Sequence, residues 1–124
     1  MQITEIRVYR FDLPVVGSYT MSKSGVAEPD STIVELVTDT GLVGHGEACL
    51  ASPLYQPEHG PGIRAALDAL APAIMGAEPT RIGLVHAVMD ATLAGSSEAK
   101  AAIDIACWDL LGKATQRRVC DLLG

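Results

Sequence analysis

Apolar and polar residues alternate at the start of the chain, which is typical of a β-strand. Within residues 3–13, Ile6 and Val8 fall on one face, whereas Tyr9 and Phe11 fall on the other. The alternation therefore changes phase inside the strand. This change predicts a bulge, or a switch of the exposed face, near Val8.

A hairpin pattern follows, after a stretch without periodicity. Residues 32–38 are rich in β-branched and apolar side chains, residues 39–41 read Asp-Thr-Gly, and residues 42–49 form the returning strand. Gly44 and Gly46 weaken that returning strand. We therefore expect them to mark a close approach by another element.

Three helical patterns complete the chain. The first has a stripe of Ile63, Leu67, Leu70 and Ile74, and the second has a stripe of Ile82, Val85, Met89 and Leu93. Pro72 should kink or end the first helix, and Gly95 should end the second. The third, residues 99–113, should be capped by Ser96 or Ser97. It is apolar over most of its circumference, so it needs cover on several sides.

Strands first and helices after predict an α+β fold: a three-stranded antiparallel meander followed by three helices. The chain has 124 residues, of which 48% are hydrophobic, so it can form a single core. One domain is expected.

The composition excludes several partners. A net charge of −6 provides no basic face for nucleic acid, and no apolar run approaches the roughly 18 residues of a membrane span. The amino terminus does not resemble a secretion signal, so we expect a cytoplasmic protein. Three cysteines without a C-x-x-C pair favour reduced core thiols over disulfides or metal ligands.

Charged pairs in the third helix could serve acid–base chemistry or only support the helix. Lys100 with Asp104, and Asp109 with Lys113, are each four residues apart and share a face. Ordinary helix pairs are the favoured interpretation.

A metal site at His45 and Glu47 is a weaker possibility. The two side chains lie on one face of a strand, but two ligands do not make a site, and a packed strand histidine is favoured. The glycines of residues 41–46 do not lead into a helix, so they do not form a phosphate loop. No nucleophile motif is present.

Two irregular stretches, residues 15–30 and 50–62, could close over a ligand. The first contains Tyr19, Met21 and Lys23, and the second contains Tyr55. A pair of solvated loops is the alternative interpretation.

Residues 99–113, Ala-Lys-Ala-Ala-Ile-Asp-Ile-Ala-Cys-Trp-Asp-Leu-Leu-Gly-Lys, open a segment that extends to residue 124. This segment resembles the first signature of the mandelate racemase/muconate lactonizing enzyme family. Residues 3–9, 37–47 and 70–72 match the family in the same order. The resemblance therefore covers nearly the whole chain.

Two positions depart from the family pattern. His45 stands where the family usually has tryptophan, and Arg117-Arg118 stand where it commonly has a glycine- or glutamine-like residue followed by proline. Residues 53–60 and 17–22 are similar to the subgroup of hydroxyproline-betaine epimerases and cis-3-hydroxyproline dehydratases.

The resemblance implies the amino-terminal capping domain of a two-part enzyme. Residues 1–113 would form this domain, and residues 114–124 would begin the connection to a barrel absent from this chain, present in cis or in trans. That barrel would hold Mg²⁺ and the bases that remove an α-proton from a carboxylate substrate, giving epimerisation or dehydration. No catalytic residue and no metal ligand is expected in this chain.

The resemblance carries over only the loops. Tyr55 would stack on a substrate ammonium, and Tyr19, Met21 and Lys23 would make specificity contacts. The parent enzyme is expected to be a homo-oligomer. The alternative is a self-contained α+β binding or assembly module without catalytic activity.

Overall fold

The computed structural model describes residues 1–14, 16–17, 19–20, 25–26, 29–50 and 57–124, with the backbone alone for residues 19–20 and 25–26. Its elements, in chain order, are β1 (Ile3–Asp12), β2 (Tyr19–Thr20), β3 (Gly25–Val26), β4 (Asp30–Thr38), β5 (Val43–Leu50), α1 (Gly60–Ile74), α2 (Ile82–Thr92), α3 (Ser97–Thr115) and α4 (Val119–Leu123). The predicted α+β fold is confirmed. The structure adds the short β2–β3 pair and the single turn of α4.

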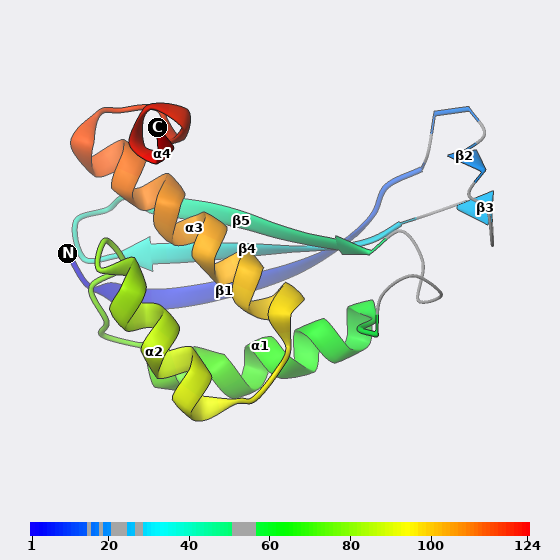
Figure 1. Cartoon of the computed structure of the whole chain (residues 1–124), viewed down its shortest axis with the longest axis horizontal. Helices are drawn as coiled ribbons and strands as arrows, with labels where there is room; N and C mark the ends of the chain where they lie inside the picture. Colours follow the sequence, from blue (N-terminus) through cyan, green and yellow to red (C-terminus); the bar gives the residue numbers. More distant parts are fainter. Residues whose placement is uncertain (15, 18, 21–24, 27–28, 51–56) are drawn as a thin grey trace.

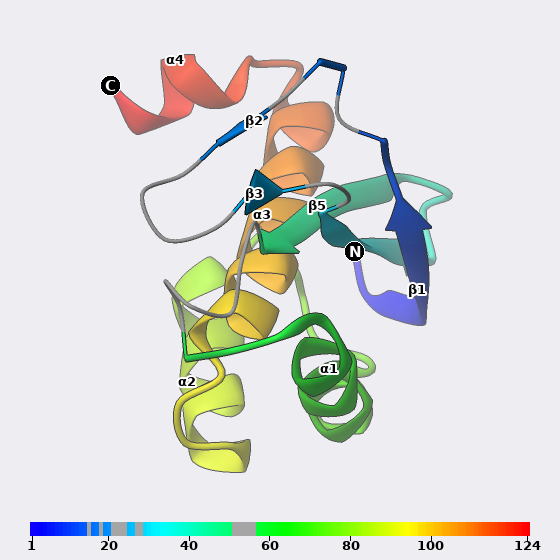
Figure 2. The same ribbon diagram turned by 90° about the vertical axis from the view of Figure 1, so that its right-hand side faces the viewer.

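The three long strands form one antiparallel sheet in the order β1-β4-β5. Figures 1 and 2 show this sheet as one layer, with the helices packed against one of its faces. Val34 and Leu36 of β4 point into that helical layer and are fully buried, whereas Glu35 between them is on the outer face. The core therefore lies between the sheet and the helices.

The bulge predicted near Val8 is wrong. Val8 pairs with Val34 in an unbroken ladder, and the register shifts instead between Ile3 and Glu5. The shift buries Ile3, whose backbone is bonded to the α1–α2 connection: its N–H donates to Ala77 O at 3.0 Å. Contacts outside the strand thus decide where the irregularity lies.

The helix stripes predicted from the sequence face the core. Ile63, Leu67, Leu70 and Ile74 of α1 are buried, as are Val85 and Met89 of α2. Pro72 does not end α1, which continues to Ile74 two residues later. No helix among the described residues is long and apolar enough to cross a membrane.

α3 packs directly on β5, and the two glycines of that strand make this possible. A Cβ atom at Gly46 would overlap the carbonyl oxygen of Ala102, and one at Gly44 would overlap the carbonyl oxygen of Ala106. The predicted close approach is confirmed, and the element that approaches is α3 of the same chain.

One of the two predicted charge pairs in α3 is wrong. Asp109 and Lys113 do pair, at 2.6 Å, but Lys100 instead binds Asp90 of α2 at 2.8 Å. Asp104 is then free to accept His86 of α2 at 2.8 Å. Lys100 and Asp104 thus each pair with a side chain of α2, and not with each other across one turn of α3.

The expectation of core thiols holds for one cysteine. Cys107 is buried in α3, whereas Cys49 and Cys120 are exposed. All three are free thiols.

Candidate functional site

Both irregular stretches leave the sheet at the same end. Asp12, the last residue of β1, is opposite Asp30, the first residue of β4, and Asp30 is also opposite Leu50, the last residue of β5. α1 begins beside them, at Gly60, on the right in Figure 1. We call this end of the domain the loop end. The described residues that bound the two stretches therefore lie together at this end.

Asp30 and Arg64 fasten the loop end together. Two guanidinium nitrogens of Arg64 donate to the two carboxylate oxygens of Asp30, at 2.7 and 3.0 Å, and Nη1 also donates to Thr32 Oγ1 at 3.0 Å. The hydrogen bonds from Arg64 hold the pKa of Asp30 below its ordinary value. β4 follows the first irregular stretch, and α1 follows the second. The Asp30–Arg64 contact thus joins the two elements to which the stretches lead.

Gly60 allows this contact to form. A Cβ atom at that position would overlap the Asp30 carboxylate. The carboxylate therefore sits against the backbone at the start of α1, which only glycine permits.

Two residues just before α1 hold the described end of the second stretch in place. The ring Nδ1 of His59 accepts a hydrogen bond from Gly62 N–H at 2.9 Å, which caps α1. Glu58 reaches across to α3, where its Oε1 accepts Ser97 Oγ at 3.0 Å and Glu98 N–H at 3.3 Å. A carboxylate at a helix amino terminus is electrostatically favourable.

Glu58 therefore takes the role predicted for a serine. Ser96 makes no side-chain cap hydrogen bond, and its φ of 53° is in the left-handed region. The cap comes from a residue almost 40 positions away in the sequence.

The chemistry available at the described part of this end is limited. Asp30 is bound by Arg64, Glu58 by the start of α3, and Glu47 by the hydroxyl of Ser31. Among the described residues, no group of three or more histidine, cysteine or acidic side chains could hold a metal ion. These residues position backbone segments and offer no Mg²⁺ ligand set.

The family model for the N-terminal domain of mandelate racemase/muconate lactonizing enzymes matches residues 3–124. The chain belongs to this family. The match favours an enzyme domain over a self-contained binding module.

Three similar proteins act on different amino-acid derivatives. The chain is 48% identical to a cis-3-hydroxy-L-proline dehydratase from Roseibium aggregatum, covering 100% of this chain and 34% of the relative. The N-succinyl Arg/Lys racemase from Bacillus cereus has a TM-score of 0.95 at 36% identity, covering 100% of this chain and 34% of that one. A dipeptide epimerase from Enterococcus faecalis, solved with Mg and the dipeptide L-Leu-L-Tyr, has a TM-score of 0.94 at 35% identity, covering 100% and 35%.

The chain thus spans about a third of the length of the family members that it matches. The two relatives with solved structures share its fold over its whole length.

Most of the binding residues expected in this family domain lie outside the described residues. This holds for Met21, Lys23 and Tyr55. Tyr19 is in β2, where it pairs with Val26 of β3, and only its backbone is described. Their roles stay predictions. Asp30, Arg64 and Glu58 were not among the residues predicted from the sequence.

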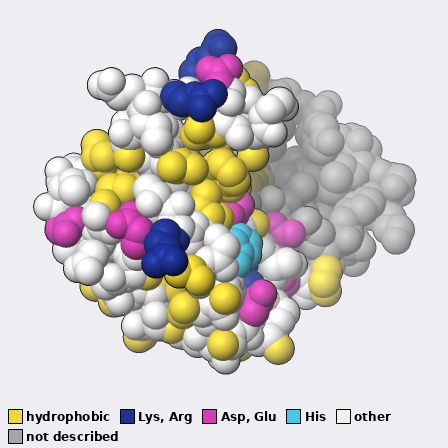
Figure 3. Space-filling model, turned by 60° about the vertical axis from the view of Figure 1, so that its left-hand side comes forward, with side chains coloured by type: hydrophobic (Ala, Val, Ile, Leu, Met, Phe, Trp, Pro, Cys, Tyr) yellow, Lys and Arg dark blue, Asp and Glu magenta, His cyan; other side chains and the backbone are white. Residues whose placement is uncertain are grey.

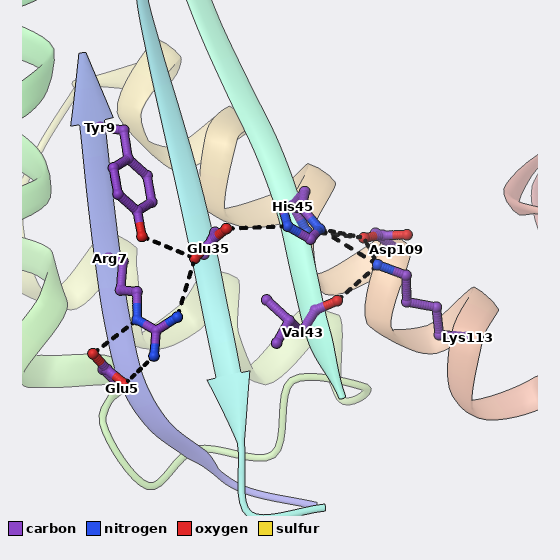
Figure 4. A network of polar contacts seen from close by, with 8 residues as sticks. All are labelled: Glu5, Arg7, Tyr9, Glu35, Val43, His45, Asp109 and Lys113. Atoms are coloured by element: carbon purple, nitrogen blue, oxygen red, sulfur yellow. Dashed lines mark hydrogen bonds and ion pairs between the residues drawn. The ribbon is translucent and has the colours of Figure 1, made fainter. Parts of the chain in front are cut away.

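His45, where the family usually has tryptophan, belongs to a row of polar contacts that crosses the outer face of the sheet (Figure 4). Its Nε2 lies 3.3 Å from Glu35 Oε1, and its backbone N–H donates to Asp109 Oδ2 at 2.9 Å. Glu35 also accepts the hydroxyl of Tyr9 at 3.2 Å and faces Arg7 at 3.5 Å. The row links β1, β4, β5 and α3. The contacts of His45 therefore have a structural role.

Asp109 is the residue of α3 that accepts hydrogen bonds from both the His45 backbone and Lys113. Burial raises its pKa, but hydrogen bonds from Lys113 and from the His45 backbone outweigh burial and leave the pKa below its ordinary value. Lys113 Nζ also donates to Val43 O at 2.7 Å. The ionised carboxylate thus ties α3 to β5.

Proposed function

We propose that this chain is the capping domain of a Mg²⁺-dependent enzyme that removes the α-proton of an amino-acid-like carboxylate. The observation that carries the proposal is the convergence of both irregular stretches at one end of a domain of this family, with their bases fixed by Asp30, Arg64 and Glu58. The products would be those of a racemase, an epimerase or a dehydratase.

The substrate class follows from what the relatives share. A hydroxyproline, an N-succinyl amino acid and a dipeptide each carry an amino-acid α-carbon, which is the carbon changed by racemisation or epimerisation. The first relative is also the one with the highest identity of the three, 48%. We therefore favour a proline derivative as the substrate.

The part of this chain in the reaction would be to enclose the substrate. Loops that close over a site exclude water and hold the reacting carbon in place, so that hydrogen bonds and charges act in a low dielectric. Tyr55 would stack on the substrate ammonium, and Tyr19, Met21 and Lys23 would line the closed loops. Mg²⁺ and the proton-removing bases would be held by a barrel that is absent from this chain and belongs to the complete enzyme. We expect the complete enzyme to be a homo-oligomer in the cytoplasm.

The test is α-proton exchange in the complete protein. Incubation in D₂O with Mg²⁺ and cis-3-hydroxy-L-proline, or with a hydroxyproline betaine, should replace the α-proton signal in the ¹H NMR spectrum or convert the substrate. The same protein with excess chelator is the control. Absence of exchange with every proline derivative, N-acyl amino acid and dipeptide tried would contradict the proposal.

The role of Tyr55 has a separate test. A tyrosine face near a cation contributes about 0.5–2 kcal/mol, so Tyr55→Ala should raise KM for a cationic substrate by about 2- to 30-fold. Tyr9→Ala is the matched control, because Tyr9 is a half-exposed tyrosine on the outer face of β1. Unchanged kinetics in Tyr55→Ala would remove Tyr55 from the site.

A further inference from the structure

Asp30 adjoins every element that bounds the two irregular stretches. It is the first residue of β4, and it is opposite Asp12, where β1 ends, and Leu50, where β5 ends. Its carboxylate also lies against the backbone of Gly60, where α1 begins. The elements that the stretches leave and the elements to which they lead therefore meet at one residue.

These element ends are held in two different ways. Backbone pairing joins the ends of β1, β4 and β5 in one ladder, whatever side chain is at position 30. α1 is outside this ladder. Its polar link to the sheet comes from Arg64, which donates to Asp30 at 2.7 and 3.0 Å and to Thr32 Oγ1 at 3.0 Å. The position of the start of α1 relative to the strands thus depends on a side-chain ion pair.

Arg10, the second cation near Asp30, does not replace this link. Its Nε is 3.7 Å from Asp30 Oδ1, and its guanidinium donates instead to Asp12, at 2.8 and 3.1 Å. Arg10 is on β1, which the ladder already holds. Loss of Arg64 would therefore leave Asp30 without a partner on α1.

The arrangement of Arg64 suits positioning better than binding of a substrate carboxylate. Both of its terminal guanidinium nitrogens are bound to Asp30, and its side chain is only 22% exposed. A substrate carboxylate would have to displace a partner that already accepts two charge-assisted hydrogen bonds.

We propose that Asp30 and Arg64 are positioning residues of the complete enzyme. Their ion pair sets where the second stretch ends relative to the first, and thereby the KM for the substrate, without touching the substrate. The inference rests on the proposed function, because it requires that the two stretches enclose a substrate. Since the pair acts on the binding segments and not on the reacting carbon, it should affect KM and leave kcat nearly unchanged.

Steady-state kinetics of α-proton exchange in the complete protein test the proposal, with cis-3-hydroxy-L-proline or the derivative that the wild type exchanges. Asp30→Asn and Arg64→Gln should each raise KM by about 5-fold, with kcat within about 2-fold of the wild type. The temperature is one at which circular dichroism shows both variants to be folded, so loss of stability alone does not change KM. Unchanged KM in both folded variants would overturn the proposal.

The double variant separates positioning from direct binding. If the two residues act only as a pair, Asp30→Asn/Arg64→Gln should raise KM no more than the larger single effect. If Arg64 bound the substrate itself, its loss would raise KM again in the Asp30→Asn background. That additive result would also overturn the proposal.

Asp90→Asn is the matched control. It breaks an ion pair with Lys100, also at 2.8 Å, that joins α2 to α3 and no strand. Seen from the side away from the loop end, acidic and basic side chains form small groups among hydrophobic ones (Figure 3). The control should leave KM unchanged. A rise as large as in Asp30→Asn would show a general effect of charge loss and would contradict a specific role of the loop end.

Failure of this inference differs from failure of the proposed function. An active wild type whose folded Asp30→Asn and Arg64→Gln variants keep the same KM would refute the positioning role alone. A complete protein that exchanges no α-proton would refute the proposed function, and this inference with it.

Discussion

Asp30 receives two guanidinium nitrogens of Arg64 at the point where both irregular stretches meet the sheet. The side chains are 28% and 22% exposed, so water screens the pair only in part. This one contact joins residues 34 positions apart. Its charge state should therefore influence how firmly the loop end is held.

The pair predicts a pH dependence of stability. The pKa of Asp30 is lower in the folded chain than its ordinary value of 3.8, so the pair stabilises the fold above pH 3.8. That stability is lost as the pH falls through the lowered pKa. Asp30→Asn should lower the unfolding midpoint at pH 7 and should flatten its decrease below pH 4.

Asp68→Asn is the control for this prediction, because Asp68 is an exposed aspartate on α1. Urea unfolding at a series of pH values measures both variants. If Asp30→Asn follows the pH profile of the wild type, the pair contributes no pH-dependent stability.

Cysteine reactivity gives a second prediction for single residues. Burial raises the pKa of Cys107 to about 12, so its thiol is neutral and shielded at pH 8. Cys49 and Cys120 are exposed. A disulfide reagent such as DTNB should modify two thiols in the native chain and a third only on unfolding. Rapid modification of Cys107 would show that α3 does not pack on the sheet as described.

The sequence revealed some of these residues and not others. Gly44 and Gly46 could be predicted because glycine inside a strand is a local signal of close approach. The Asp30–Arg64 contact could not, since it depends on how α1 packs against β4. The predicted Lys100–Asp104 pair failed for the same reason: α2 supplies Asp90 as a closer partner.

At the scale of elements, the packing of α3 on β5 positions the row of polar contacts that includes His45 and Asp109. Gly46→Ala would force a methyl group against the carbonyl of Ala102. Overpacking of this kind costs about 1–3 kcal/mol, so the free energy of unfolding should fall by at least that amount.

Gly83→Ala is the matched control, since a Cβ there meets nothing within 4 Å and the residue is in α2. It should leave the free energy of unfolding unchanged or raise it by up to about 1 kcal/mol. Urea denaturation measures both. Equal effects of the two substitutions would contradict the close packing of α3.

Periodicity predicted the elements well, and their ends less well. The stripes of α1 and α2 were correct because burial of one face is encoded in the local spacing. At the start of α3, the predicted N-cap position is correct, since Ser96 is the N-cap residue. The expected serine cap hydrogen bond is wrong, because Glu58 accepts the hydrogen bonds there. The register shift in β1 likewise depends on Ala77, which lies far along the chain.

At the scale of the whole molecule, two features lie outside the packed core. One is the loop end, and the other is an open apolar hollow between α3 and α4, whose lining includes Ile105, Trp108, Val119 and Leu123. The sequence pointed to the family and to uncovered surface on α3. It could not locate the hollow between α3 and α4, because residues 114–124 were interpreted as the start of a connection, whereas Val119 and Leu123 of α4 line that hollow.

The native mass of the protein from its source tests the central claim most directly. A capping domain of this family, which spans 34% of its dehydratase relative, should be isolated as part of a chain of about three times 13.0 kDa. Such a mass is the result that we expect. A native mass of 13.0 kDa would contradict the account, because these residues would then form the whole protein, without a partner domain to cap.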